Sequence, residues 1–298
     1  GPDGAEHCAR RRPGPLLCFE AGTACKGEMM IRLIVSDLDG TLLNGKKELS
    51  PRFFLLWEQL QERGVIFAAA SGRPLSVLRA LFAPAGGKIA LIGHNGGAVE
   101  CGGKLLHAGG FGKDGAARVA AACADIPTAH LLADREDGLF LLDEHPGFLQ
   151  VCSRYFAQYS PMPAEALFCG EQRFYRMAVW DSGDAAKTCA RMAGALQAEF
   201  DLMLSGDGWI DIMKKGEGKG RCLSVLQEAL GVTEEETMGF GDYLNDAAFL
   251  QRCGQSYAMK NAHRALKERC RFVTERTNEE EGVVFEICRR LGICLSSK

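Results

Sequence analysis

Residues 31–93 show short apolar runs separated by amphipathic stretches. The runs are almost continuously apolar, which is typical of parallel strands in a sheet covered on both faces. The stretch at 50–64 has helical spacing, with Ser50 as a predicted N-cap and Pro51 at the first helical position. The pattern predicts strands over 31–35, 65–71 and 88–93 and helices over 50–64 and 74–82.

The pattern changes near residue 98, where a predicted hairpin turns at Gly102-Gly103. Strand-like and helical stretches are mixed from there to about residue 208. This block predicts helices over 113–124, 147–159 and 185–196 and strands over 129–133, 138–143, 174–180 and 200–205. After 209–215 the first pattern returns, with predicted helices over 219–230 and 245–253 and strands over 237–240 and 256–259.

We therefore predict an α/β fold in which one core is interrupted by an inserted domain. The core is a doubly wound, Rossmann-like parallel sheet formed by residues 29–97 and 209–298, and residues 98–208 form an inserted α+β domain. Residues 1–28 contain glycine, proline and charge without any period. We expect them to be a disordered leader or a cloning remnant, because their apolar run is too short for a signal peptide.

Composition and charge exclude several classes of protein. Of the 298 residues, 47% are hydrophobic and 24% are charged, which are ordinary values for a globular chain. The net charge of −3, without a dense lysine/arginine stripe, argues against nucleic-acid or anionic-membrane partners. No apolar run approaches the roughly 20 residues of a spanning helix. The 13 cysteines include no C-x-x-C pair, which favours reduced thiols and a cytoplasmic location.

Four groups of polar residues stand at the ends of predicted core strands or at a helix start. In doubly wound sheets, chemistry gathers at the carboxyl ends of the strands. The groups are Asp37 with Asp39, the S-G-R sequence at 71–73, Lys219, and the G-D-Y-L-N-D sequence at 241–246. Because strand residues two apart share a face, we expect Asp37 and Asp39 to point toward one bound group.

These carboxylates suit a hard cation. Asp242, Asn245 and Asp246 lie at i, i+3 and i+4, on one face of a starting helix. Together with Asp37 and Asp39 they offer the oxygen ligands that Mg²⁺ takes, commonly beside a substrate phosphate. A cation also removes the repulsion between two carboxylates one residue apart. We therefore predict Mg²⁺ as the cofactor.

The same residues fit phosphoryl transfer. Asp37 is suited to act as a nucleophile that splits hydrolysis into two easier displacements. Asp39, if it is held protonated, can give a proton to the leaving oxygen and later take one from water. Ser71 and Lys219 can hold the equatorial phosphate oxygens, and Gly40 lets the backbone close on the phosphate.

On these residues the chain resembles the haloacid-dehalogenase (HAD) superfamily of phosphatases, and within it the Cof-type hydrolases with a C2 (IIB) cap. D-L-D-G-T-L matches the first motif, S-G-R the second, Lys219 the third and G-D-Y-L-N-D the fourth. The resemblance covers about residues 30–298. It implies that Mg²⁺ is held by the Asp37 carboxylate, the Asp39 carbonyl and Asp242.

The motifs of the resemblance also indicate which residues contact the substrate. They are Gly40, Thr41, Gly72, Arg73 and Asn245. Arg73 is either a surface residue or a phosphate contact, and Asn245 either binds substrate or only caps a helix. Asp246 supports the site by orienting the lysine or a metal-bound water. Asn95 is expected to form a turn into the inserted domain, and no role is assigned to His94.

The sequence thus predicts a Mg²⁺-dependent phosphatase that acts through an aspartyl-phosphate intermediate. Its substrate is a small phosphorylated metabolite, either a sugar phosphate or a cofactor phosphate, and this class follows from the resemblance alone. Two alternatives stay open. A phosphomutase would use the same aspartates but return the phosphoryl group to a sugar, and a non-catalytic binding module would share only the fold.

Overall fold

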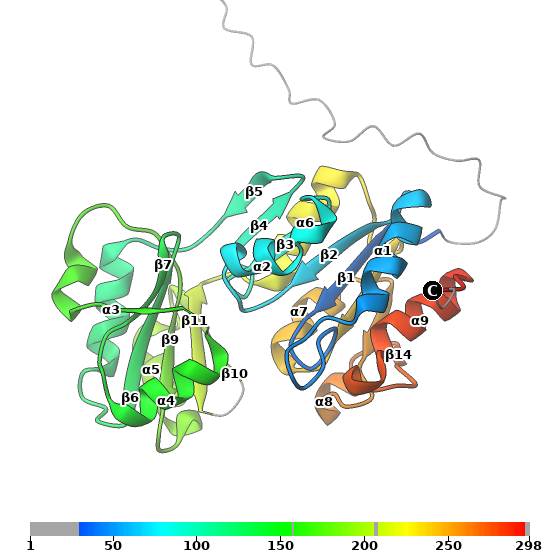
Figure 1. Cartoon of the computed structure of the whole chain (residues 1–298). Helices are drawn as coiled ribbons and strands as arrows, with labels where there is room; N and C mark the ends of the chain where they lie inside the picture. Colours follow the sequence, from blue (N-terminus) through cyan, green and yellow to red (C-terminus); the bar gives the residue numbers. More distant parts are fainter. Residues whose placement is uncertain (1–29, 157, 206–207, 296–298) are drawn as a thin grey trace, which may run out of the picture.

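The computed structural model describes residues 30–156, 158–205 and 208–295, so the predicted leader at 1–28 lies outside the described residues. Figure 1 shows two parts, each built on its own sheet. We call the part around the eight-stranded sheet the core and the part around the six-stranded sheet the cap. Buried apolar side chains form one cluster in the core and two clusters in the cap.

The core sheet is parallel except at one edge. Its strands are β1 (Leu33–Asp37), β2 (Ile66–Ala70), β3 (Ala90–Gly93), β4 (Ala98–Cys101), β5 (Lys104–Ala108), β12 (Thr237–Gly241), β13 (Gln255–Ala258) and β14 (Phe272–Val273). Their order is β14-β13-β12-β1-β2-β3-β4-β5, and the pairs β3-β4 and β4-β5 are antiparallel. All residues of β1, β2 and β12 are buried, which requires cover on both faces of the sheet.

Two groups of helices supply that cover. The core helices are α1 (Pro51–Glu62), α2 (Leu75–Leu81), α6 (Lys219–Leu230), α7 (Ala247–Leu250), α8 (Arg264–Lys267) and α9 (Gly282–Leu291), with 3₁₀ turns η1 (Ala83–Ala85), η3 (Leu244–Asp246) and η4 (Asn278–Glu280). α1 packs against α9, and α6 packs against α7. The helix α1 begins as predicted, because the Ser50 hydroxyl accepts a hydrogen bond of 3.1 Å from the Arg52 amide.

The cap is a mainly antiparallel sheet with helices on both faces. Its elements are α3 (Lys113–Cys123), β6 (Ala129–Arg135), β7 (Gly138–Leu141), α4 (Pro146–Tyr155), β8 (Ser160–Pro161), η2 (Ala164–Phe168), β9 (Phe174–Asp181), α5 (Ala185–Leu196), β10 (Phe200–Ser205) and β11 (Trp209–Lys214). The strand order is β10-β11-β9-β6-β7-β8. Val119 of α3 and Met192 of α5 share one apolar cluster, whereas Phe148 of α4 packs in another with Ala178 and Trp209.

The boundaries predicted for the inserted domain are wrong. The hairpin β4-β5, which lies inside the predicted insertion at 98–208, pairs with β3 and completes the core sheet. The strand β11, predicted within the core segment at 209–298, pairs with β9 and β10 in the cap sheet. Backbone hydrogen bonds therefore move the connecting segments to about 109–112 and 215–218.

The predicted α/β fold class is confirmed, and most predicted strands and helices are present within one or two residues at each end. The helix predicted over 245–253 is instead the 3₁₀ turn η3 followed by the short α7. The reason is local: an Asp246 carboxylate oxygen accepts hydrogen bonds from the Asp242 and Tyr243 amides, which tightens the first turn. The pattern did not predict β8, β14, α8 or α9.

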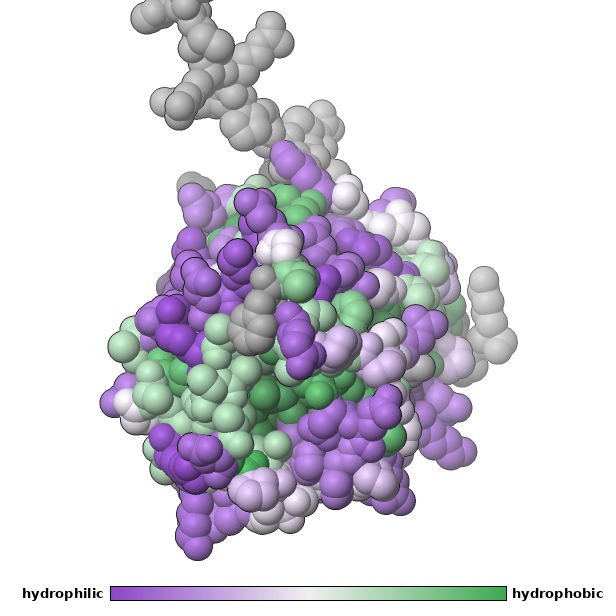
Figure 2. Space-filling view, turned by 90° about the vertical axis from the view of Figure 1, so that its left-hand side faces the viewer, coloured by the Kyte–Doolittle hydropathy of each residue, from purple (hydrophilic) through white to green (hydrophobic). Residues whose placement is uncertain are grey.

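The surface on the cap side is mixed in character. Figure 2 looks at the left-hand side of Figure 1, where α3 lies, and hydrophobic areas alternate there with hydrophilic ones. In the part of the chain that the structure describes, no helix is both long enough and apolar enough to cross a bilayer.

Candidate active site

Core and cap together line a pocket of about 310 Å³. Its core residues end β1, follow β1, β2, β3 or β12, or open α6: Asp37, Asp39, Lys47, Ser71, Gly72, Arg73, Asn95, Lys219, Asp242, Tyr243 and Asn245. Its cap residues are Tyr155, Phe156, Arg176, Ala178, Ser205, Trp209 and Asp211. The structure therefore brings the four predicted groups of polar residues to one place.

Lys219 joins two carboxylates at the centre of this site. Its Nζ lies 2.6 Å from Asp37 Oδ1 and 2.7 Å from Asp246 Oδ1, and all three side chains are buried. Burial raises the pKa of Asp37 well above its ordinary value, and the negative charge of Asp246 raises it further, against the opposing effect of Lys219. Burial lowers the pKa of Lys219, but Asp246 and Asp37 outweigh it and keep the ammonium charged.

Asp242 is positioned by the first and fourth motifs together. Thr41 Oγ1 donates a hydrogen bond of 3.0 Å to Asp242 Oδ1. Gly40 has φ +87°, and a Cβ on it would lie 2.4 Å from Asp242 Oδ2. Gly40 is therefore needed because Asp242 approaches its backbone closely. Burial and the charge of Asp246 raise the pKa of Asp242 to about 6.

The carboxylates fit a divalent cation. Oxygens of Asp37, Asp242 and Asp246 lie within 4.8 Å of one another. Three carboxylates against the single ammonium of Lys219 leave an excess of negative charge, which adds to the effect of burial in raising the pKa values of Asp37 and Asp242. Both oxygens of Asp246 already accept hydrogen bonds from protein donors. Asp37 and Asp242 are therefore the side chains with oxygen available to a hard cation.

Asp39 is paired with two cations, Arg73 and Lys47. Arg73 donates two hydrogen bonds to its carboxylate, at 3.0 and 2.7 Å, and Lys47 Nζ lies 3.0 Å from Asp39 Oδ1. Burial raises the pKa of Asp39, but Arg73 and Lys47 outweigh burial and lower it below its ordinary value. These two cations favour the carboxylate form of Asp39 in this arrangement, whereas the predicted general-acid role needs the protonated form.

Ser71 and Arg73 lie on the same wall of the pocket. The Ser71 hydroxyl is buried and accepts a hydrogen bond of 3.2 Å from the Arg73 amide, so it shapes the S-G-R turn. It does not cap α2, whose N-cap residue is Pro74. Arg73 lines the pocket and pairs with Asp39, and its contact with a substrate phosphate stays a prediction.

A buried polar network joins the cap to this wall, and the sequence analysis missed it. Arg176 in β9 donates to Asp134 Oδ2 at 3.1 Å, to Asp211 Oδ1 at 2.8 Å and to the Gly72 carbonyl at 3.2 Å. On the core side, His94 Nδ1 lies 2.7 Å from Asp134 Oδ1. A single charged residue inside an otherwise apolar strand was the available signal, as in F-Y-R-M-A-V-W and W-I-D-I-M.

Asn95 and Asn245 extend the same network. Asn95 Nδ2 donates to Asp211 Oδ2 at 3.1 Å, and Asn245 Nδ2 donates to Asn95 Oδ1 at 3.3 Å. His94 and Asn95 both have positive φ, 55° and 56°, a conformation that few residues other than glycine adopt. Asn95 is thus more than a turn residue, because its amide links Asp211 of the cap to the fourth motif.

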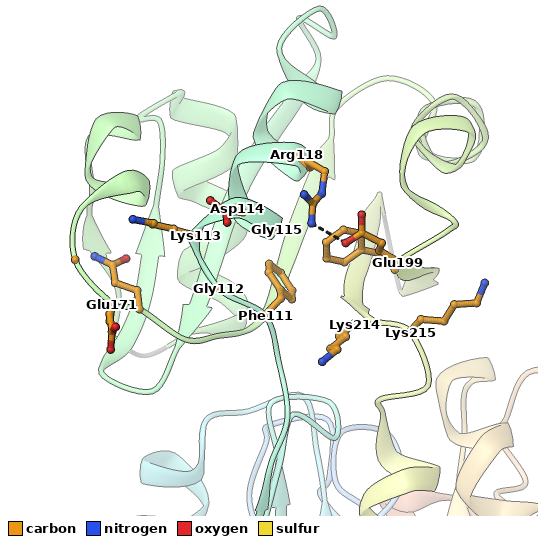
Figure 3. A pocket seen from close by; sticks show the side chains of 13 residues that line it. Phe111, Gly112, Lys113, Asp114, Gly115, Arg118, Glu171, Glu199, Lys214 and Lys215 are labelled. Atoms are coloured by element: carbon orange, nitrogen blue, oxygen red, sulfur yellow. Dashed lines mark hydrogen bonds and ion pairs between the residues drawn. The ribbon is translucent and has the colours of Figure 1, made fainter.

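A second hollow, of about 600 Å³, lies on the cap at the start of α3 and the end of β11 (Figure 3). Its charged side chains are partly paired. Arg118 lies 2.6 Å from Glu199, and Lys215 Nζ donates to the Gln197 carbonyl at 2.9 Å. None of the four motif groups lines this hollow, so the pocket at Asp37 remains the candidate site.

The fold and the site define an α/β enzyme of the phosphoryl-transfer type, and comparison with known proteins gives its family. The family model of the haloacid dehalogenase-like hydrolases matches residues 34–287. The chain belongs to this family, as its four motifs predict, and the prediction of a Cof-type HAD phosphatase is confirmed.

Curated and solved relatives span nearly the whole chain. The 5-amino-6-(5-phospho-D-ribitylamino)uracil phosphatase YbjI of Escherichia coli is 28% identical over 261 residues, covering 86% of this chain and 94% of YbjI. The HMP-PP phosphatase of Escherichia fergusonii is 28% identical over 249 residues, covering 80% of this chain and 87% of that protein. The crystal structure of SMU.1108c from Streptococcus mutans has a TM-score of 0.81 and 26% identity, covering 88% of this chain and 100% of that one.

Proposed function

We propose that this protein is a Mg²⁺-dependent phosphatase that hydrolyses small phosphomonoesters through phosphorylated Asp37. One observation carries the proposal: the Asp37 carboxylate lies 2.6 Å from the Lys219 ammonium and beside Asp242, in a pocket shared by core and cap. An oxygen nucleophile, a fixed cation and carboxylates for a second cation are the parts that phosphoryl transfer needs.

In the first step, an Asp37 oxygen attacks the phosphorus, the bond from phosphorus to the leaving oxygen breaks, and protonated Asp39 gives its proton to that oxygen. Lys219 stabilises the charge on the phosphoryl oxygens and fixes the second Asp37 oxygen. In the second step, water attacks the phosphorus of the aspartyl phosphate and its proton passes to Asp39. Inorganic phosphate leaves and the Asp37 carboxylate is restored.

Asp39 is the proposed acid and base, and its ion pairs decide when it can act. As a carboxylate beside Arg73 and Lys47 it is ready to accept a proton from water. Asp39 must itself be protonated before it can donate a proton to the leaving oxygen. A substrate phosphate that draws Arg73 or Lys47 away from Asp39 would remove the charge that keeps its pKa low.

The Asp37 and Asp242 carboxylates, with the Asp39 carbonyl, would hold Mg²⁺, as the family resemblance implies. The cation would neutralise negative charge on the reacting phosphate and on the nucleophile. Thr41 and Gly40 keep Asp242 in place, and Asp246 orients both Lys219 and the turn that carries Asp242.

The proposed substrates are small phosphorylated metabolites, either sugar phosphates or cofactor phosphates. Two relatives that cover most of this chain are named as phosphatases of a ribitylaminouracil phosphate and of HMP-PP, which supports a small metabolite. We also propose a cytoplasmic location without a nucleic-acid or membrane partner, on the charge and cysteine pattern of the sequence.

Phosphate release from a panel of phosphomonoesters tests the proposal. We expect release with Mg²⁺, none with EDTA, and a loss of at least about 10³-fold in Asp37→Asn. A phosphomutase would interconvert sugar phosphates with little free phosphate, and no turnover of any ester by folded protein with Mg²⁺ would leave only the binding module.

A further inference from the structure

Three of the seven cap residues that line the pocket are aromatic. The residues of this cap wall are Tyr155 and Phe156 at the end of α4, Ala178 in β9, Ser205 in β10 and Trp209 in β11, with Arg176 and Asp211 beside them. The two charged residues are ion-paired at 2.8 Å, and Arg176 is also paired with Asp134. Among the described residues of this wall, the cap therefore presents aromatic rings and hydroxyl groups but no unpaired charge.

The three rings form one cluster. Trp209 lies edge-to-face with Tyr155, with ring centroids 6.2 Å apart at 81°, and with Phe156, at 5.9 Å and 88°. Trp209 is 6% exposed and packs in the cap interior with Ala178, whereas Tyr155 is 48% exposed. Tyr155 is thus a large aromatic side chain that stays accessible at a pocket, where such residues commonly contact a ligand.

The core side of the same pocket is charged. Asp37, Lys219, Arg73 and Asp242 all lie on the core side. A bound phosphomonoester therefore has one orientation that matches the pocket, with its phosphate on the core side and its organic group against the rings of the cap. The pocket volume of about 310 Å³ falls in the range of small-molecule sites.

From this polarity, and resting on the proposed function, we propose that Tyr155, Phe156 and Trp209 bind a flat aromatic or heteroaromatic leaving group. The site would then prefer phosphate esters that carry such a ring over simple sugar phosphates. A flat ring gains contact with aromatic faces and edges. Sugar hydroxyls against the same wall would lose water without enough hydrogen-bonding partners.

Two esters of matched reactivity test this preference. Pyridoxal 5′-phosphate and glucose 6-phosphate are both esters of primary alcohols, and they differ in carrying a heteroaromatic or a sugar ring. For wild type we expect kcat/KM to be at least about tenfold higher for the pyridoxal ester. Tyr155→Ala should lower that value by about three- to tenfold and leave glucose 6-phosphate within about twofold.

Tyr159→Ala is the matched control, because Tyr159 packs against the same cap cluster but does not line the pocket. Tyr159→Ala should leave kcat/KM unchanged for both esters. This result separates loss of the ring wall from loss of cap stability. Equal turnover of both esters by wild type, or an equal loss of both in Tyr155→Ala, overturns the ring preference and leaves the phosphatase proposal intact.

Binding measurements test the ring preference independently of catalysis. Calorimetry on Asp37→Asn with Mg²⁺ compares the dissociation constants of the two esters without turnover. Tighter binding of the pyridoxal ester, weakened by adding Tyr155→Ala, supports the ring wall even if wild type releases no phosphate. Equal dissociation constants for the two esters contradict it whatever the wild-type activity is.

Discussion

Arg176 in the cap donates a hydrogen bond of 3.2 Å to the carbonyl oxygen of Gly72 in the core. This bond joins the cap sheet directly to the S-G-R turn that lines the phosphate end of the pocket. Arg176 is itself fixed by Asp134 and Asp211, two carboxylates of the cap. The position of the cap is thus coupled to the wall that carries Ser71 and Arg73.

Replacing Arg176 with alanine should destabilise the fold strongly. Asp134 and Asp211 would stay buried without their cation, and breaking a buried pair in this way costs about 3–5 kcal/mol. Urea unfolding measures the loss, and adding Asp134→Asn and Asp211→Asn should restore part of it. Arg173→Ala, which removes an exposed arginine of the same region, should stay within about 0.5 kcal/mol of wild type.

Gly40→Ala should reduce activity more than stability. The new Cβ would lie 2.4 Å from Asp242 Oδ2, so Asp242 must move, and Gly40 also has φ +87°. Displacement of a catalytic group by about 1 Å can lower kcat/KM by about 10²-fold. We expect a loss of that size and a higher Mg²⁺ requirement. Gly86→Ala is the control, because Gly86 has φ +59° but no atom near the new Cβ.

Asp246→Asn should lower kcat although Asp246 is not proposed to contact the phosphate. One Asp246 oxygen accepts from Lys219 and the other from the Asp242 and Tyr243 amides. An amide group cannot accept at both positions, so either the lysine or the turn loses its partner. Replacing a residue that orients metal ligands typically lowers activity by about 10- to 100-fold, and we expect kcat to fall by about that factor. An unchanged kcat would show that Asp246 is only structural.

Asp39→Asn should discriminate between esters by their leaving group. A general acid matters most when the leaving oxygen is basic, so a primary alkyl phosphate should lose about 10²- to 10⁴-fold in kcat/KM. Formation of the aspartyl phosphate from 4-nitrophenyl phosphate, followed in a single turnover, should fall much less. Equal losses for both esters would assign Asp39 a role in positioning rather than in proton transfer.

Much of the fold could be predicted because its signals are local. Continuous apolar runs marked β1, β2 and β3, and Ser50 with Pro51 marked the start of α1. The edges of the sheets could not be predicted in this way. The residues of the hairpin β4-β5 and of the strand β11 do not mark which sheet they join, and only tertiary pairing decides.

The candidate site was also predicted only in part from the sequence. The spacing of Asp37, Lys219 and Asp242 predicted groups that meet at the ends of strands, and the structure brings them together. The network around Arg176 depends on pairing between β9, β6 and β11, far apart in the chain, so spacing carries no signal for it. The ionised state of Asp39 likewise depends on which cations pack beside it.

Phosphorylation of Asp37 is the most direct measurement. The reaction of wild type with Mg²⁺ and an ester that it hydrolyses is quenched with acid within one turnover. The peptides of the protein are then analysed by mass spectrometry. We predict one added phosphoryl group on Asp37, which disappears as turnover completes and is never seen in Asp37→Asn. Rapid turnover with Asp37 unmodified at every time, or undiminished turnover by Asp37→Asn, would contradict nucleophilic catalysis by this residue.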